Sequence, residues 1–186
     1  VKQPIAYNRI ANLVKSTGVA TSATSVIDFV RYLREACLVF SIENYATKFV
    51  EKETNKKHYF VDNGLLALFL TNPEASLLEN ICAIYLYRLY GEEVYFYNKN
   101  VEVDFYLPSE ETAIQVCYSL GDVETFQRET GALIKLANHV PLRRMVIITR
   151  DEERTIALPD QLTFLKKFTL LEMELLKVAL HFLKLK

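Results

Sequence analysis

The stretch that decides the fold is residues 101–118, which read VEVDFYLPSEETAIQVCY. Apolar and polar side chains alternate through residues 101–107 and again through residues 113–118. Because successive side chains of a β-strand point to opposite faces of the sheet, this alternation predicts two strands, each with one apolar face. Between them, residues 108–112 contain proline, serine and two glutamates and predict a hairpin turn.

The polar faces of these two strands carry a distinctive group of side chains. Asp104 lies on the polar face of the first strand, and Gln115 and Cys117 lie on the matching face of the second. A hairpin brings these faces together, so we expect a carboxylate, an amide and a thiol to meet at one edge of a sheet. Glu79, on a helix that precedes the hairpin, can approach the same group.

The residues around the hairpin predict an α/β domain over residues 71–186. Ser76 offers an N-cap for its first helix, and Gly91 is placed to end that helix. The order of helices and strands favours an α/β sandwich around a mixed sheet. Besides the hairpin, the predicted elements are a helix at 77–90, a strand at 94–97, a helix from Asp122 or Thr125 to about 138, a buried strand at 144–149 and an apolar helix at 170–186.

Residues 1–70 predict a smaller domain, which Pro73 and its polar neighbours separate from the rest. Two helices are followed by two strand-like runs that flank a charged stretch. Helix, turn, helix and charged hairpin form the outline of a winged helix. The predicted elements are helices at 8–16 and from about 22 or 25 to 36, strands at 38–42 and 58–61, and a charged stretch at 51–57.

Three short motifs follow one another in a specific order: Leu-Glu-Asn at 78–80, Glu-Val-Asp-Phe at 102–105 and Ile-Gln-Val-Cys at 114–117. Together they make the chain resemble the C-terminal module of unknown function that follows the ATPase domain in a large family of prokaryotic AAA-type ATPases. That module is similar to a winged helix followed by a PD-(D/E)XK restriction-endonuclease-like α/β/α domain. The resemblance extends from about residue 7 to about residue 155.

The resemblance implies a metal-dependent nuclease centre. Carried over to this sequence, Glu79 is the helix acid, Asp104 the central metal ligand and Gln115 the second ligand, while Cys117 occupies the position of the catalytic lysine. In such a centre, oxygen ligands hold a hard cation such as Mg²⁺. The cation and the lysine activate water and stabilise the charge that develops on phosphorus.

Two departures from this pattern predict an inert centre. Gln115 offers an amide oxygen but no negative charge, and the thiol of Cys117 carries no positive charge. Loss of one electrostatic group typically lowers a rate by about 10²–10³-fold. The alternative is an active Mg²⁺-dependent DNA nuclease whose cation has moved to Arg128 or Lys135 on the following helix.

Structural interpretations of the same residues stay open. Asp104 is equally explained as a buried acid that accepts hydrogen bonds from the backbone or from arginine. Without the resemblance, Glu79 is better explained as a helix cap or salt-bridge partner, and Cys117 as an ordinary buried thiol.

Binding partners are suggested by charge and by apolar surface. Residues 1–70 hold nine Lys/Arg against six Asp/Glu, whereas residues 71–186 hold thirteen against seventeen. Phosphate contact with DNA is expected at the wing lysines, although packing against an upstream ATPase domain is an equal alternative. The apolar residues of 170–180 suggest a third possibility, a protein-interaction or homo-oligomer surface. The wing lysines are Lys48, Lys52, Lys56 and Lys57.

Several features limit the functions open to this chain. Its five glycines are isolated and none precedes Lys-Ser or Lys-Thr, so ATP is expected only in an upstream domain that the chain does not contain. The start at Val1, without an initiator methionine, is consistent with a fragment. No apolar run reaches the roughly 18–20 residues needed to span a bilayer. Three scattered cysteines suggest neither disulfide nor zinc site, and therefore a cytoplasmic protein.

Overall fold

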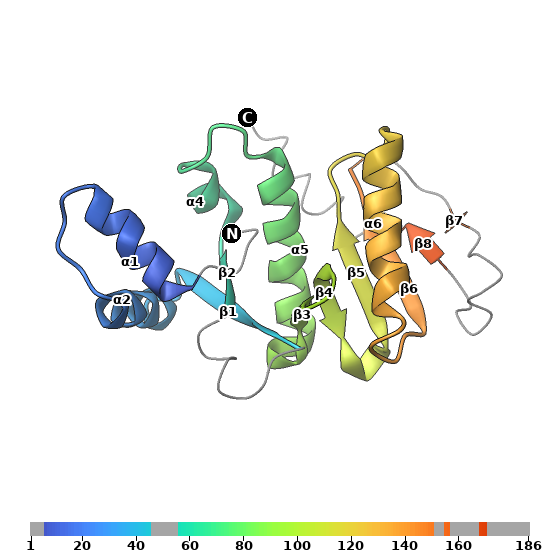
Figure 1. The fold of residues 1–186 in the computed structure, drawn as a ribbon, viewed down its shortest axis with the longest axis horizontal. Coiled ribbons are helices and arrows are strands. Elements are labelled where there is room, and N and C mark those ends of the chain that lie inside the picture. The colour runs from blue at the N-terminus through green and yellow to red at the C-terminus, as the bar shows by residue number, and fades with distance from the viewer. Residues whose placement is uncertain (1–5, 46–55, 151–154, 157–167, 171–186) are drawn as a thin grey trace. The chain divides into compact units, whose positions relative to one another are not determined.

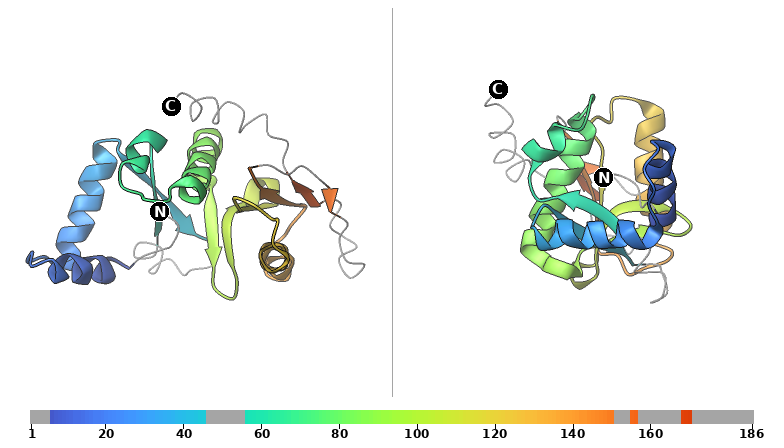
Figure 2. Two further views of the ribbon diagram at one scale, coloured as in Figure 1. Left: turned by 90° about the horizontal axis from the view of Figure 1, so that it is seen from above. Right: turned by 90° about the vertical axis from the view of Figure 1, so that its left-hand side faces the viewer.

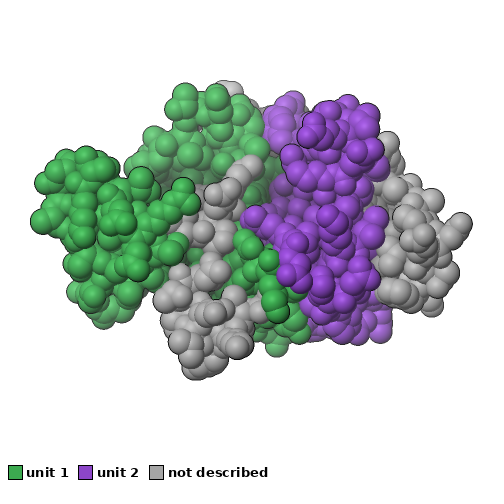
Figure 3. Space-filling model, in the orientation of Figure 1, with its two compact units in different colours: residues 1–99 green, residues 100–186 purple. Residues whose placement is uncertain are grey.

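The computed structural model describes residues 6–45, 56–150, 155–156 and 168–170 (Figure 1). The chain divides into two compact units, Val1–Lys99 and Asn100–Lys186, shown in separate colours in Figure 3. Each unit combines helices with strands that run both parallel and antiparallel. The expected α/β class with a mixed sheet is therefore confirmed.

The first unit begins with two helices, α1 (Tyr7–Ser16) and α2 (Ala23–Glu35), which cross at a steep angle (Figure 2). Gly18 follows α1 with a φ of 87°, a conformation that glycine adopts without steric cost. The hydroxyl of Ser22 accepts a hydrogen bond from the backbone N–H of Ser25 at 3.1 Å and caps α2. Both predicted helices are confirmed, with Ser22 as the N-cap of the second.

An antiparallel hairpin follows, formed by β1 (Val39–Asn44) and β2 (Lys56–Phe60), with β3 (Tyr95–Asn98) parallel to β1 on its other side. The helix α5 (Glu74–Tyr90) ends at Gly91, whose φ of 59° again favours glycine. A short helix, α4 (Asn63–Ala67), was not anticipated from the sequence. Its N-cap is Asp62, whose carboxylate accepts from the N–H of Leu65 at 2.8 Å.

Asn80 attaches α5 to the hairpin. Its side chain is buried, accepts from the backbone N–H of Phe60 at 2.9 Å and donates to the carbonyl of Phe60 at 3.0 Å. It also donates to the side-chain oxygen of Asn63 at 2.8 Å. Buried polar groups need such partners, so residues 74–90 are tied to the preceding strands. The boundary expected near residue 70 therefore falls inside the first unit, and Pro73 precedes α5 as its N-cap.

The second unit is built on the predicted hairpin of β4 (Glu102–Leu107) and β5 (Thr112–Val116), in which Phe105 lies opposite Ile114. The helix α6 (Val123–Leu136) forms the crossover connection from β5 to β6 (Arg144–Ile148), which is parallel to β5. A connection of this length is needed between two parallel strands. Figures 1 and 2 show α6 against one face of these strands. Asp122 caps α6 by accepting from the N–H groups of Glu124 and Thr125.

Two short strands complete the described part of this unit: β8 (Phe168–Leu170) is parallel to β6, and β7 (Thr155–Ile156) is antiparallel to β8. The apolar helix predicted at 170–186 lies outside the described residues, except for Leu170 at the end of β8. Across the ranges that the structure describes, no helix is both long and apolar enough to cross a membrane.

His58 is an exception to the rule that buried polar atoms are paired. Its Nδ1 lies 2.9 Å from the hydroxyl of Ser41, and its ring contacts Tyr7 at a centroid distance of 5.9 Å. Its Nε2 is buried and has no hydrogen-bond partner among the described residues. Burial, assisted by the positive charges of Arg34 and Lys56, lowers the pKa of His58 from 6.5 to about 4. The folded unit therefore favours a neutral imidazole.

We predict that His58 makes folding pH-dependent in a specific window. Because its pKa is lower in the folded state, its contribution is complete above pH 6.5 and is lost as the pH falls toward 4. Between pH 7 and pH 5 the expected loss is about 2 kcal/mol of unfolding free energy. Urea denaturation of His58→Phe should remove this share of the pH dependence. His139→Phe, at an exposed histidine, is the matched control; equal slopes for both variants would contradict the prediction.

Candidate functional site

Asp104 and Gln115 meet as the sequence predicts, on adjacent strands of the second unit. The register that pairs Phe105 with Ile114 places them opposite one another. The backbone N–H of Asp104 donates to the side-chain oxygen of Gln115 at 2.7 Å, and the N–H of Val116 donates to Oδ2 of Asp104 at 2.9 Å. Each side chain thus binds the backbone of the other strand. We refer to these two contacts as the interstrand clasp.

The clasp continues onto α6 through a residue that sequence reasoning missed. The amide nitrogen of Gln115 donates to Oε2 of Glu129 at 2.7 Å, and both side chains are buried, at 7% and 8% exposure. The other oxygen, Oε1, accepts from Nε and from a terminal nitrogen of Arg128 at 3.1 and 2.7 Å. The sequence did contain a signal for the burial of Glu129. It lies at helical spacing from Ala132, Leu133 and Leu136, which form the buried face of α6.

Cys117 and Arg128 both border this network. The thiol of Cys117 is half-buried and donates to the carbonyl of Ser119 at 3.1 Å. The pKa of Arg128 is raised, first by its hydrogen bonds to Glu129 and to a smaller extent by the thiol of Cys117. The guanidinium is held by Glu129, with its donors on Oε1. Lys135 is exposed and lies about 10 Å further along α6.

Glu79 belongs to the first unit, where it is part of a buried charged cluster. It is 3% exposed and accepts from the hydroxyl of Tyr59 at 2.9 Å. The ammonium of Lys57 lies 3.6 Å from it and 5.6 Å from the ring centroid of Phe96. Within its unit, Glu79 is thus a salt-bridge partner in the interior of α5 and not a helix cap.

The wing lysines require a correction. Lys57 is fully buried, and Lys56 is 8% exposed with its ammonium 3.2 Å from Glu43. A buried ammonium that is paired with a carboxylate does not reach a phosphate on the surface. The expectation of phosphate contact therefore has no support at these two residues. Lys48 and Lys52 lie outside the described residues.

The second unit does not fit a Mg²⁺ centre with this set of donors. Gln115 uses its oxygen for the N–H of Asp104, and both oxygens of Glu129 accept charged or amide donors. A hard cation needs several oxygen ligands whose lone pairs are available. Throughout the described ranges, no group of three or more His, Cys, Asp or Glu side chains is suitable for holding a metal.

Comparison with known proteins adds one distant similarity. No protein-family model matches the chain, and no solved structure matches it. A curated relative is the uncharacterized protein MJ1544 of Methanocaldococcus jannaschii, which is 30% identical over 158 residues. The match covers 80% of this chain and 35% of the relative, so the chain spans about a third of that protein's length.

The network predicts that Gln115→Glu destabilises the second unit. The new carboxylate would lie against Glu129 without a hydrogen to donate, so the expected cost is about 2–3 kcal/mol at pH 8. Repulsion raises the pKa of the new acid in the folded state, so stability should recover as the pH falls to 5, where a shared proton restores the hydrogen bond. Chemical denaturation at both pH values measures this. Gln127→Glu, at an exposed position of α6, is the control; a similar response in both variants would refute the network's role.

Proposed function

We propose that this chain is the accessory C-terminal region of a prokaryotic AAA-type ATPase. Its first residues form a winged-helix-like part, and its second unit is a nuclease-like domain that binds and regulates without cutting. The observation that carries the proposal is the interstrand clasp. Asp104 and Gln115 have the order and pairing expected of a nuclease centre, yet their polar atoms form hydrogen bonds between strands and with Glu129.

The chemistry of Cys117 supports an inert centre. A phosphodiester-cleaving site needs positive charge to stabilise the transition state. Cys117 supplies none, and the nearby guanidinium of Arg128 is neutralised by Glu129 at 2.7 Å. The centre thus lacks both the second ligand carboxylate and an uncompensated cation. Binding of a partner does not require these catalytic groups, whereas hydrolysis does.

The winged-helix interpretation of the first unit is supported by its element order, α1 and α2 followed by the antiparallel pair β1 and β2. The surface of α2 favours a protein partner over DNA. Phe29, Tyr32 and Leu33 are all exposed and recur at helical spacing. Arg31 lies between two acids of the same helix, 3.0 Å from Asp28 and 3.8 Å from Glu35. Its charge is therefore largely compensated.

The link to an ATPase rests on the order of the three sequence motifs. About two thirds of the archaeal relative lies outside the matched part, which is compatible with a further domain in that protein. The exposed apolar residues of α2 are suited to packing against such a domain.

An active nuclease is the second candidate, and one observation favours it. Arg128 is an exposed cation in the same unit and interacts electrostatically with Cys117, the position of the missing lysine. For this candidate to hold, the guanidinium would have to leave Glu129 and contact the phosphate. Arginine is well suited to phosphate recognition because its donors form a rigid fork.

A cleavage assay distinguishes the two candidates. We expect plasmid and linear DNA incubated with the protein and Mg²⁺ or Mn²⁺ to remain at background cleavage. Asp104→Ala should leave that background unchanged, as should the control Glu102→Ala, at an exposed acid of the same strand. Metal-dependent cutting that disappears in Asp104→Ala but persists in Glu102→Ala would establish the nuclease and end the inert interpretation.

A gel shift at two salt concentrations tests whether the binding partner is DNA. A protein with 6–10 phosphate contacts loses about 10³–10⁵ in affinity between 50 and 200 mM salt. Because Arg31 is paired and Lys56 and Lys57 are buried, we expect weak binding with a shallow salt dependence. We also expect Arg31→Ala and the exposed-surface control Arg143→Ala to behave alike. Tight, steeply salt-dependent binding that Arg31→Ala weakens would instead make the first unit a DNA-binding module.

A further inference from the structure

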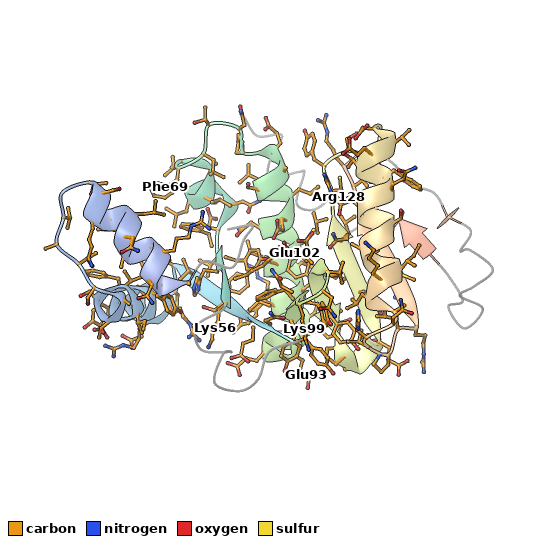
Figure 4. All side chains as sticks on the ribbon, in the orientation of Figure 1. Lys56, Phe69, Glu93, Lys99, Glu102 and Arg128 are labelled. Atoms are coloured by element: carbon orange, nitrogen blue, oxygen red, sulfur yellow. The ribbon has the colours of Figure 1, made fainter. Side chains whose placement is uncertain are left out.

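The helix α5 of the first unit carries apolar side chains around its whole circumference, although one side of it is exposed. Most of the circumference is buried, and we call the uncovered side, which contains Ile81, Tyr85 and Leu89, the outer strip of α5. Tyr85 is 36% exposed, Leu89 is 56% exposed and Ile81 is half-buried. Figure 4 draws the side chains of α5 and labels Glu93 just beyond its C-terminal end. Because a helix that is apolar on every side is normally buried on every side, the outer strip is suited to contact with another protein surface.

Two opposite charges lie at the ends of the same strip. Glu74 and Arg88 are both exposed, and each is seven residues, or about two helical turns, from Ile81. Residues seven apart lie on nearly the same side of a helix, so Glu74, Ile81 and Arg88 are aligned along the outer strip. Along the helix axis, Glu74 and Arg88 are about 21 Å apart. They are therefore too far apart to pair with each other in one chain.

We propose that a second copy of this chain covers the outer strip, with the two α5 helices antiparallel and the two-fold axis of the pair at Ile81. In this arrangement, residues equally far before and after Ile81 face one another. Glu74 of each copy therefore meets Arg88 of the other, which gives two identical ion pairs, as a two-fold interface requires. The two Ile81 side chains meet at the centre, and Leu89 of each copy lies beside Pro73 of the other. This inference goes beyond the proposed function and does not rest on it.

The two ion pairs require a small angle between the helices. Each pair lies about 10 Å along the axis from Ile81. At a crossing angle of about 20°, the helix axes stay roughly 8–10 Å apart over this length, a distance that the side chains of Glu74 and Arg88 can bridge. At about 50° the helix ends diverge, and both pairs would be lost. The positions of the charges therefore favour the shallow, antiparallel packing of a helical bundle.

The dimer is expected to be weak. One side of a helix of 17 residues is smaller than the roughly 800 Å² per partner of a standard interface. Exposed ion pairs add little affinity, but like charges in their place oppose association strongly. We expect a Kd on the order of 10–100 μM at low salt and weaker association at high salt, because salt screens exposed charges.

Charge reversal tests both the face and the direction of the pairing. Glu74→Lys places two cations opposite one another, and Arg88→Glu places two anions opposite one another. Each variant alone should therefore dimerise at least about tenfold more weakly than the wild type. Mixed in equal amounts, the two variants should form a heterodimer, because both contacts between them are attractive. The double variant with both reversals should recover the affinity of the wild type. Sedimentation velocity from about 10 μM to about 1 mM protein follows the mass.

Two control variants make the same charge changes on other helices. Glu124→Lys alters an acid in the first turn of α6, as Glu74→Lys does in α5. Lys15→Glu alters a base in the last turn of α1, as Arg88→Glu does in α5. Both controls should dimerise as the wild type does. If a reversal at α5 prevents folding, Leu89→Gln replaces it, because this residue is exposed and its change weakens the apolar contact without altering charge.

Three results would overturn the inference. The first is a wild-type protein that stays monomeric over the whole concentration range at low salt. The second is a dimer that neither reversal at α5 weakens, which would place the contact on another surface, such as the exposed residues of α2. The third is a mixture of the two single variants that forms no heterodimer, which would exclude the antiparallel arrangement.

Discussion

The second unit depends on the amide of Gln115, which has one polar atom for each of two different partners. Its oxygen accepts from the backbone of Asp104, and its nitrogen donates to Glu129. A buried group of this kind is stable only if both atoms are satisfied. Glutamine is the side chain that meets both demands at this length, because a glutamate has no N–H and a lysine has no acceptor. Gln115 therefore links β4, β5 and α6, and this role requires a side chain with both a donor and an acceptor.

In the first unit, asparagine side chains form comparable hydrogen bonds to the backbone. Asn80 binds both the N–H and the carbonyl of Phe60, and Asn44 does the same for Asn98, at 3.0 and 2.8 Å. A side-chain amide has the same donor and acceptor as a peptide group, so it can hydrogen-bond a strand residue as another strand would. The buried pair of Lys57 and Glu79 is a more costly arrangement, made tolerable by the hydroxyl of Tyr59 and the ring of Phe96. The buried polar residues of both units thus have a structural role: they provide hydrogen-bond partners for other buried polar groups.

The local features of the fold could be predicted, and the long-range ones could not. Alternation of side chains correctly located β4 and β5 and the meeting of Asp104 with Gln115. The spacing of Glu129 along α6 indicates burial, but its partner Gln115 lies 14 residues earlier on a strand, and periodicity does not identify that contact. Lys57 was expected at the surface because it belongs to a charged run, yet in β2 its side chain is fully buried. Composition marks a loop near residue 70 but does not reveal that Asn80 ties α5 to the preceding hairpin, which places α5 in the first compact unit. Ser22 and Asp122 were each among the alternatives predicted for a helix start, because a cap is a contact between residues close in sequence. The predicted cap Ser76 was wrong, since α5 begins at Glu74.

Formal charge decides which ligands the centre of the second unit can attract. Asp104 and Glu129 contribute two negative charges, Arg128 contributes one positive charge, and Gln115 and Cys117 contribute none. A phosphodiester therefore approaches a centre with a net negative charge, which opposes its binding. If a divalent ion replaced the guanidinium, the same groups would become neutral and still not positive. Addition of a divalent ion alone consequently does not give this centre the positive charge that attracts a phosphate. The balance of charges thus disfavours nucleic-acid contact at this centre, while the hydrogen bonds that join Gln115, Glu129 and Arg128 satisfy its buried polar atoms.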